Sequence, residues 1–141
     1  MSNKDELEKI RSQIDAIDSS ILELVNQRSL LAKETANLKK SNDIYKPERE
    51  AKIIRNLISL NEGPLAEKQI ISIFNEIISS CRQLEKEIKV SYLGPEGTFS
   101  EEAVKEVFGS SVTKSSTVTI EEAISDVSKG NSNYAIVPIE N

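Results

Sequence analysis

The sequence has 141 residues, none of which is histidine, and it has one cysteine. Without histidine, the chain lacks the usual proton carrier near neutral pH and the commonest zinc ligand. Ser–His and Cys–His nucleophile pairs are therefore excluded, and a zinc site is not expected. A single cysteine allows no internal disulfide, which fits a reducing compartment. An enzyme built from this chain is expected to act through binding and fixed electrostatics.

Excess positive charge and long apolar runs are also missing. The chain has 23 acidic and 18 basic side chains, a net charge of −5, which argues against a nucleic-acid partner. No apolar run approaches the roughly 20 residues that span a bilayer, and the first residues contain no apolar signal core. We therefore expect a cytoplasmic protein without a membrane partner.

Helix-breaking residues are absent from the first third of the chain, since no glycine or proline precedes Pro47. Apolar side chains recur there at steps of three and four, which predicts one helix from about Asp5 to Lys40. The apolar stripe on this helix consists of Leu7, Ile10, Ile14, Ile17, Ile21, Leu24, Leu31 and Leu38. The helix would be roughly 50 Å long, so a chain of this size cannot cover the stripe by folding back. We expect the covering helix to come from a second copy of the chain.

Three cations have defined positions on this helix. Arg28 and Lys39 lie about three turns apart on one face, roughly 16 Å along the axis, and their long side chains can hold one small anion between them. Arg11 lies about 25 Å before Arg28 and is rotated off that face, so it cannot reach the same ligand within one chain. If two helices pair antiparallel in a dimer, Arg11 can enter the partner's site.

Two more helices are predicted before residue 89. Residues 41–43 are expected to break the first helix, and Pro47 suits the first position of the second. The second helix is expected to end at residues 61–64, where glycine and proline give a strong stop signal. A third helix is expected from there to about Ile88.

After residue 89, short apolar runs alternate with helix signals. Strands are expected at residues 90–93, around Val112 and at residues 134–137. Strands that alternate with helices are typical of an α/β unit with a parallel sheet.

Two capping signals define the helices of this second region. Ser100 is the expected N-cap of the first helix, while Thr119 and Glu122 form a capping box that opens the second. About fifty residues are too few to bury such a sheet on both faces. We therefore interpret residues 1–89 as a helical domain and residues 90–141 as an incomplete α/β domain.

Several features, taken in order along the chain, carry a family resemblance. They are Arg11, Arg28, Lys39 and residues 47–50, 77–85, 92–100 and 137–141. In this order they resemble the bifunctional chorismate mutase–prephenate dehydratases, with an all-helical mutase domain followed by the start of the dehydratase domain. The resemblance implies a periplasmic-binding-protein-like α/β fold for that second part.

The resemblance further implies an intertwined homodimer that rearranges chorismate to prephenate, in phenylalanine biosynthesis, without a cofactor or a metal. Each site is then built mainly from one chain and receives one arginine from the other, which Arg11 matches. Arg28 matches a second arginine that binds a carboxylate. Lys39 matches the lysine that contacts the ether oxygen and a carboxylate of the substrate.

Other substrate-binding positions are also implied by the resemblance. Arg49 and Glu50 match a pair on the second helix, where the glutamate holds the substrate hydroxyl. Cys81 falls where many members have serine, and Glu85 falls where members carry glutamine or glutamate. Lys46 occupies a position that is often acidic in the family, so we assign it no catalytic role.

The chemistry of this rearrangement suits these residue types. Chorismate is a dianion, and the reaction is intramolecular, so it needs no nucleophile, metal or proton transfer. The protein has to hold a compact conformer and stabilise negative charge that grows on the ether oxygen. Lys39 can do this directly, whereas Glu85 can donate a hydrogen bond only when it is protonated. Burial beside an anionic substrate would raise its pKa.

Each of these residues also has a simpler interpretation. Arg28 can be a surface arginine, Lys39 can complement a helix C-terminus, and Cys81 can be a small core residue. Arg11 can pair with Asp15 one turn later.

Two other functions therefore stay open. A non-catalytic helical dimerisation scaffold would give the cations no ligand, and a small-acid sensor would bind without turnover. The later dehydratase motifs and the regulatory region implied by the resemblance are not among these residues. We therefore expect neither dehydratase turnover nor phenylalanine feedback from this chain.

Overall fold

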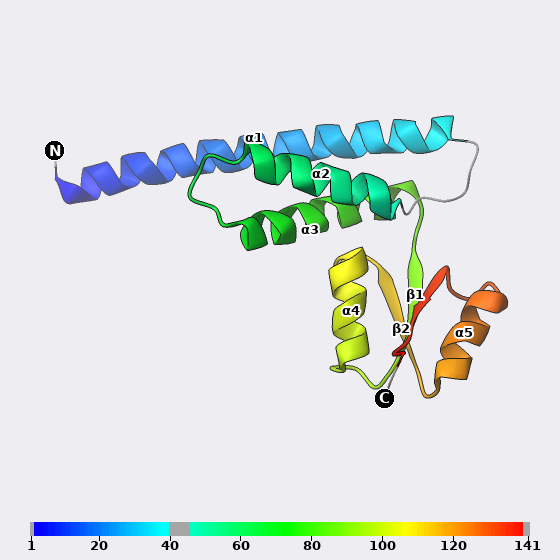
Figure 1. Cartoon of the computed structure of the whole chain (residues 1–141). Coiled ribbons are helices and arrows are strands. Elements are labelled where there is room, and N and C mark those ends of the chain that lie inside the picture. The colour runs from blue at the N-terminus through cyan, green and yellow to red at the C-terminus, as the bar shows by residue number, and fades with distance from the viewer. Residues whose placement is uncertain (1, 40–45, 140–141) are drawn as a thin grey trace.

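The computed structural model describes residues 2–39 and 46–139, in which five helices and three strands follow one another. The helices are α1 (Asn3–Leu38), α2 (Pro47–Leu60), α3 (Glu67–Glu85), α4 (Phe99–Phe108) and α5 (Ile120–Ser128). The strands are β1 (Lys89–Leu93), β2 (Thr113–Thr117) and β3 (Tyr134–Ile136). Figure 1 shows α1, α2 and α3 packed together, with the strands next to them and α4 and α5 on opposite sides of the sheet. The predicted order, a three-helix region and then a small α/β region, is confirmed.

Helix α1 begins after Ser2, whose hydroxyl accepts the backbone N–H of Asp5, and continues for 36 residues without a break. Its C-terminal half packs against α3, where Ser29 Oγ lies 3.5 Å from Cys81 Sγ. Its N-terminal half extends beyond α2 and α3 (Figure 1). The break predicted at residues 41–43 lies outside the described residues.

The apolar stripe on α1 is uncovered in one chain. The exposed fraction of its side chains ranges from 45% at Leu7 to 84% at Leu38, and no residue of α1 is buried. The prediction that a single chain leaves this stripe exposed is therefore confirmed. The half-buried positions of α1 form a neighbouring face of mostly small residues, which lets α3 approach closely; they are Val25, Arg28, Ser29, Ala32 and Ala36.

Helix α3 ends at Glu85, three residues before the predicted end at Ile88. The reason is that Ile88 belongs to the core of the α/β region, together with Val90 and Tyr92 of β1. The Gln83 side chain accepts the backbone N–H of Ile88 at 3.3 Å, which holds the chain as it leaves the helix. The connection between the two regions is therefore short.

The sheet is parallel and has the order β2–β1–β3. Alternation along β1 directs Val90 and Tyr92 into a core with Val104 and Phe108 of α4. Ser91, between them, bonds instead to Asp126 of α5, with 2.9 Å between the hydroxyl and the carboxylate. Each face of the central strand is thus covered by one helix.

Two predictions within the α/β region are wrong. The N-cap of α4 is Thr98 rather than Ser100, because Thr98 Oγ1 donates to the Leu93 carbonyl and fixes the turn before the helix. Strand β2 starts after Val112, which is itself buried in the core. The strand pairs with β1 through its backbone and consists of threonine, serine and lysine, so hydrophobic patterning does not reveal it.

The capping box predicted for α5 is confirmed in its Thr119 half. Thr119 Oγ1 accepts the backbone N–H of Glu122 at 3.1 Å. The Glu122 carboxylate accepts the backbone N–H of Val118 at 3.0 Å, one residue before the N-cap, rather than that of Thr119 as a capping box requires. Within residues 2–39 and 46–139, no helix is long and apolar enough to cross a membrane.

Candidate active site

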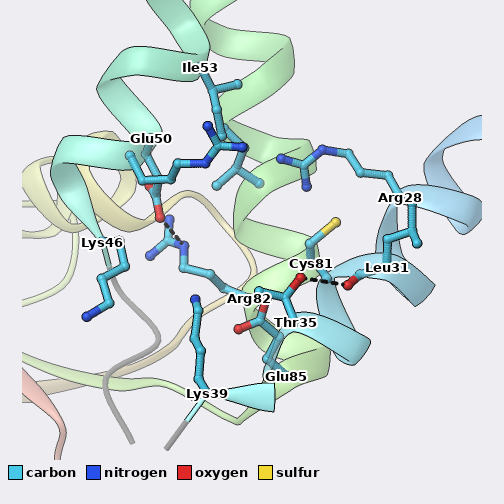
Figure 2. A pocket seen from close by; sticks show the side chains of 13 residues that line it. Arg28, Leu31, Thr35, Lys39, Lys46, Glu50, Ile53, Cys81, Arg82 and Glu85 are labelled. Atoms are coloured by element: carbon cyan, nitrogen blue, oxygen red, sulfur yellow. Dashed lines mark hydrogen bonds and ion pairs between the residues drawn. The ribbon is translucent and has the colours of Figure 1, made fainter. Parts of the chain in front are cut away.

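A cavity of about 290 Å³ lies where the C-terminal half of α1 meets the start of α2 and the C-terminal half of α3 (Figure 2). Its cationic lining residues are Arg28, Lys39, Lys46, Arg49 and Arg82. Two carboxyl groups, Glu50 and Glu85, also line it. The remaining wall is apolar or uncharged and consists of Leu31, Ala32, Thr35, Ile53, Ile78 and Cys81. With five cations against two carboxyls, the lining has an excess of positive charge, which favours an anion over a cation.

Helix α1 supplies Arg28 and Lys39, which lie on the same side of the helix, as three helical turns require. Figure 2 shows both side chains directed into the cavity. Lys39 caps the helix, with its backbone N–H donating to the Thr35 carbonyl, so its side chain leaves the helix at the cavity.

Helix α2 places Arg49 and Glu50 at the cavity because Pro47 opens the helix and leaves both residues in its first turn. The Glu50 carboxylate pairs with Arg82 of α3, at 3.0 Å between Oε2 and Nε. Lys46, for which the sequence predicts no role, is half-buried and also lines the cavity.

Arg82 is a site residue that the sequence analysis missed. It is only 5% exposed and lies four residues after Ile78, in the apolar register of α3. A buried arginine is costly unless its charge is paired, so an arginine at an apolar position of a helix indicates an ion pair or a binding site. This spacing is the sequence signal for Arg82. Cys81 beside it is 2% exposed and forms part of the cavity wall.

Burial shifts the pKa of both carboxyl groups upward from the value of an exposed glutamate. Burial raises the pKa of Glu85, while Lys39 and the two arginines Arg82 and Arg28 oppose that shift. Burial likewise raises the pKa of Glu50, against the opposing charges of Arg82 and Arg28. Within the described part of the chain, the buried Oε2 of Glu85 has no hydrogen-bond partner. A protonated Glu85 can therefore donate to a ligand in the cavity.

Arg11 is not brought to this cavity within one chain. It lies on the exposed N-terminal half of α1, where its guanidinium pairs with Glu8 at 3.3 Å. The alternative pairing with Asp15 is not the one observed. This position agrees with the separation of about 25 Å between Arg11 and Arg28 along the helix axis, which prevents the two residues of one chain from binding the same small ligand.

Sequence comparison supports a specific chemistry for this cavity. The family model described as chorismate mutase type II matches residues 10–86, which include every lining residue of the cavity. The chain belongs to the chorismate mutase type II family. The prephenate dehydratase family model matches residues 90–141, so the two matches divide near the short connection between α3 and β1.

Similar curated proteins carry both names. A bifunctional chorismate mutase/prephenate dehydratase of Pseudomonas aeruginosa is 38% identical over 148 residues, covering 100% of this chain and 40% of that protein. Its counterpart from Stutzerimonas stutzeri is 40% identical with the same coverage. The Aquifex aeolicus protein is 41% identical and covers 97% of this chain and 40% of its own. The chain thus spans about 40% of the length of these relatives.

Proposed function

We propose that this chain is a chorismate mutase, which rearranges chorismate to prephenate in the cavity between α1, α2 and α3 without a cofactor. The observation that carries the proposal is the ring of five cations and two carboxyls around one cavity, inside the region that matches the family. A substrate with two carboxylates needs such fixed cations, and the reaction needs no other reactive group.

The proposed roles follow from position and charge. Arg28 binds one substrate carboxylate, and Lys39 contacts the ether oxygen whose charge grows as its bond to carbon breaks. Glu85, protonated, donates a second hydrogen bond to that oxygen. Glu50 accepts a hydrogen bond from the substrate hydroxyl, with Arg49 beside it on the same turn of α2.

We further propose that the protein is a cytoplasmic homodimer in which Arg11 of each chain completes the partner's site. The uncovered stripe along α1 supports this, since eight large apolar side chains in a row are costly to leave in water. An antiparallel pairing of two α1 helices would bring the N-terminal half of one helix beside the cavity of the other. The boundary between the two domains is proposed near residue 89.

The decisive experiment follows chorismate absorbance with the purified protein. Turnover to prephenate is expected, and binding without turnover would instead support a small-acid sensor. The double variant Arg28→Ala, Lys39→Ala separates the scaffold alternative. An enzyme stays dimeric and loses turnover, whereas a scaffold stays dimeric and has no turnover to lose.

The relatives are also named for a second activity, prephenate dehydratase, and we propose that this chain contributes only part of the domain for it. We infer that residues 90–141 form the first part of a dehydratase domain, and that residues 1–141 alone produce no phenylpyruvate from prephenate. All three residues of β3 are only half-buried, so this sheet has room for further packing. Phenylpyruvate formation by this 141-residue chain would contradict the inference.

A further inference from the structure

We propose that Arg82 is a positioning residue through which helix α4 of the α/β region orients Glu50 in the mutase cavity. The inference rests on the proposed function and extends it, because it makes the geometry of the mutase site depend on the docking of the second region. Two sets of contacts and the position of one carbonyl group support it.

The first set belongs to Arg82 itself. Its Nε lies 3.0 Å from Glu50 Oε2 in the cavity. Its Nη2 donates to the Phe108 carbonyl of α4 at 3.2 Å, and its guanidinium carbon lies 5.8 Å from the centroid of the Phe108 ring. A planar guanidinium can bind in two directions at once, so one side chain here joins the two regions.

The second set fixes the end of α4 against α3. A Cβ added at Gly109 would lie 2.3 Å from the Ser79 Cβ, so only glycine allows this approach. The Ser110 backbone N–H donates to Glu76 Oε1 at 3.0 Å, and the hydroxyls of Ser80 and Ser111 lie 3.1 Å apart. The end of α4 therefore docks on the face of α3 that adjoins Arg82.

The third observation concerns the carbonyl group at the end of α4, which accepts the hydrogen bond from Arg82. Phe108 is the last residue of α4, so the carbonyl that accepts from Arg82 lies at the negative end of the helix dipole. A buried arginine needs such a partner, because an incompletely paired buried charge is costly. If α4 moves away, Arg82 gains rotamer freedom and Glu50 loses its fixed position.

A double-mutant cycle in the full chain tests this coupling. Because Glu50 binds the substrate in its ground state and transition state alike, Arg82→Met is expected to raise KM for chorismate about tenfold with a smaller change in kcat. Gly109→Ala, which separates α4 from α3, is expected to raise KM about threefold to tenfold. The double variant is expected to match Arg82→Met alone, because α4 acts through Arg82.

Matched variants separate docking from other effects. Gly130→Ala strains a similar positive φ in the same region, but its added Cβ meets nothing within 4 Å, so KM is expected to stay at the wild-type value. Ser79→Val wedges the same contact from the α3 side and replaces Gly109→Ala if that variant does not fold. A merely destabilised protein would show a lower apparent kcat with KM unchanged, which would overturn the proposal.

A second readout does not depend on mutase activity. Burial raises the pKa of Glu50 and the charge of Arg82 opposes that rise, so a carbon-13 NMR titration of the carboxyl groups should show the pKa rising further in Arg82→Met and, to a smaller extent, in Gly109→Ala. If the wild-type chain had no turnover, the proposed function would fail while this titration still decided the coupling. Additive KM effects, or a Glu50 pKa unchanged by the docking variants, would contradict the inference.

Discussion

The helical region and the α/β region bury their apolar side chains in different ways. In the described residues, the buried hydrophobics of the helical region are all on α3: Ile70, Ile78 and Cys81. The smaller α/β region instead buries one packed cluster, which consists of Ile88, Val90, Tyr92, Val104, Phe108 and Val112, and it also buries Ala123 on α5. The longest helix of the molecule contributes no buried residue. The difference teaches that the α/β region buries its apolar side chains within one chain, whereas the helical region leaves the apolar stripe of α1 exposed and lines its interior with charged side chains.

The largest expected effect concerns the charge of that cavity. Lys39→Gln is expected to lower kcat for chorismate about a thousandfold, because a neutral amide stabilises growing charge on the ether oxygen far less than an ammonium. Chorismate absorbance measures the loss. Lys33→Gln is the matched control, since it removes an exposed lysine of the same helix outside the cavity and should leave kcat unchanged. An equal loss in both variants would show that the cavity has no special role.

The next effect tests whether the exposed stripe is an interface. Ile14 of α1 and Ile124 of α5 are exposed to nearly the same extent, 51% and 52%. Ile14→Asp is expected to weaken the dimer at least about a hundredfold. The reason is that each dimer would bury two copies of Ile14, one from each chain, and the variant replaces both with a charged residue. Ile124→Asp should leave the dimer intact. Sedimentation over a concentration series measures both, and a monomeric wild-type chain would contradict the dimer.

A smaller effect is expected in the α/β core. Val104 is fully buried between α4 and β1, and Val104→Ala is expected to lower the free energy of unfolding of this region by about 2 kcal/mol. Val118→Ala, at an 83% exposed position, should change it little. Urea unfolding followed by NMR of the α/β residues distinguishes the two. An equal loss in both variants would mean that this region lacks a closed core.

The smallest expected effect is the pH dependence of mutase activity. It is tested by comparing one carboxyl group from each region, Glu85 and Glu101. Burial raises the pKa of Glu85, so its protonated, donating form is lost as pH rises through that pKa, and mutase activity should fall by about tenfold. In the α/β region, the Gly97 backbone N–H, Lys114 and Tyr92 lower the pKa of Glu101.

The two carboxyls should therefore differ in the pH–rate profile. Glu85→Gln should flatten the profile, because an amide donates at every pH. Glu101→Gln should leave it unchanged. A wild-type rate constant that is constant from mildly acidic to alkaline pH would remove Glu85 from the mechanism.

Patterns within a single segment are sufficient to predict α1 and the start of α5. The spacing of large apolar residues predicts α1, and the Thr119 hydroxyl with Glu122 predicts the start of α5. The sequence predicts the N-cap of α4 two residues too late, because the Thr98 hydroxyl donates to the Leu93 carbonyl and gives no capping signal within its own helix. Val112 predicts a strand around itself, but β2 starts at Thr113 and consists of polar residues, which hydrophobic patterning does not detect.

The sequence by itself determined the long first helix and the common face of Arg28 and Lys39, because both follow from 3.6 residues per turn. It also determined, through the resemblance that its motifs carry, the positions of Arg49, Glu50 and Glu85. Only the tertiary structure decided that Arg82 joins Glu50 to α4 and that both Arg82 and Lys39 oppose the rise in the pKa of Glu85. These properties depend on contacts between distant segments, which no periodicity within one segment can encode.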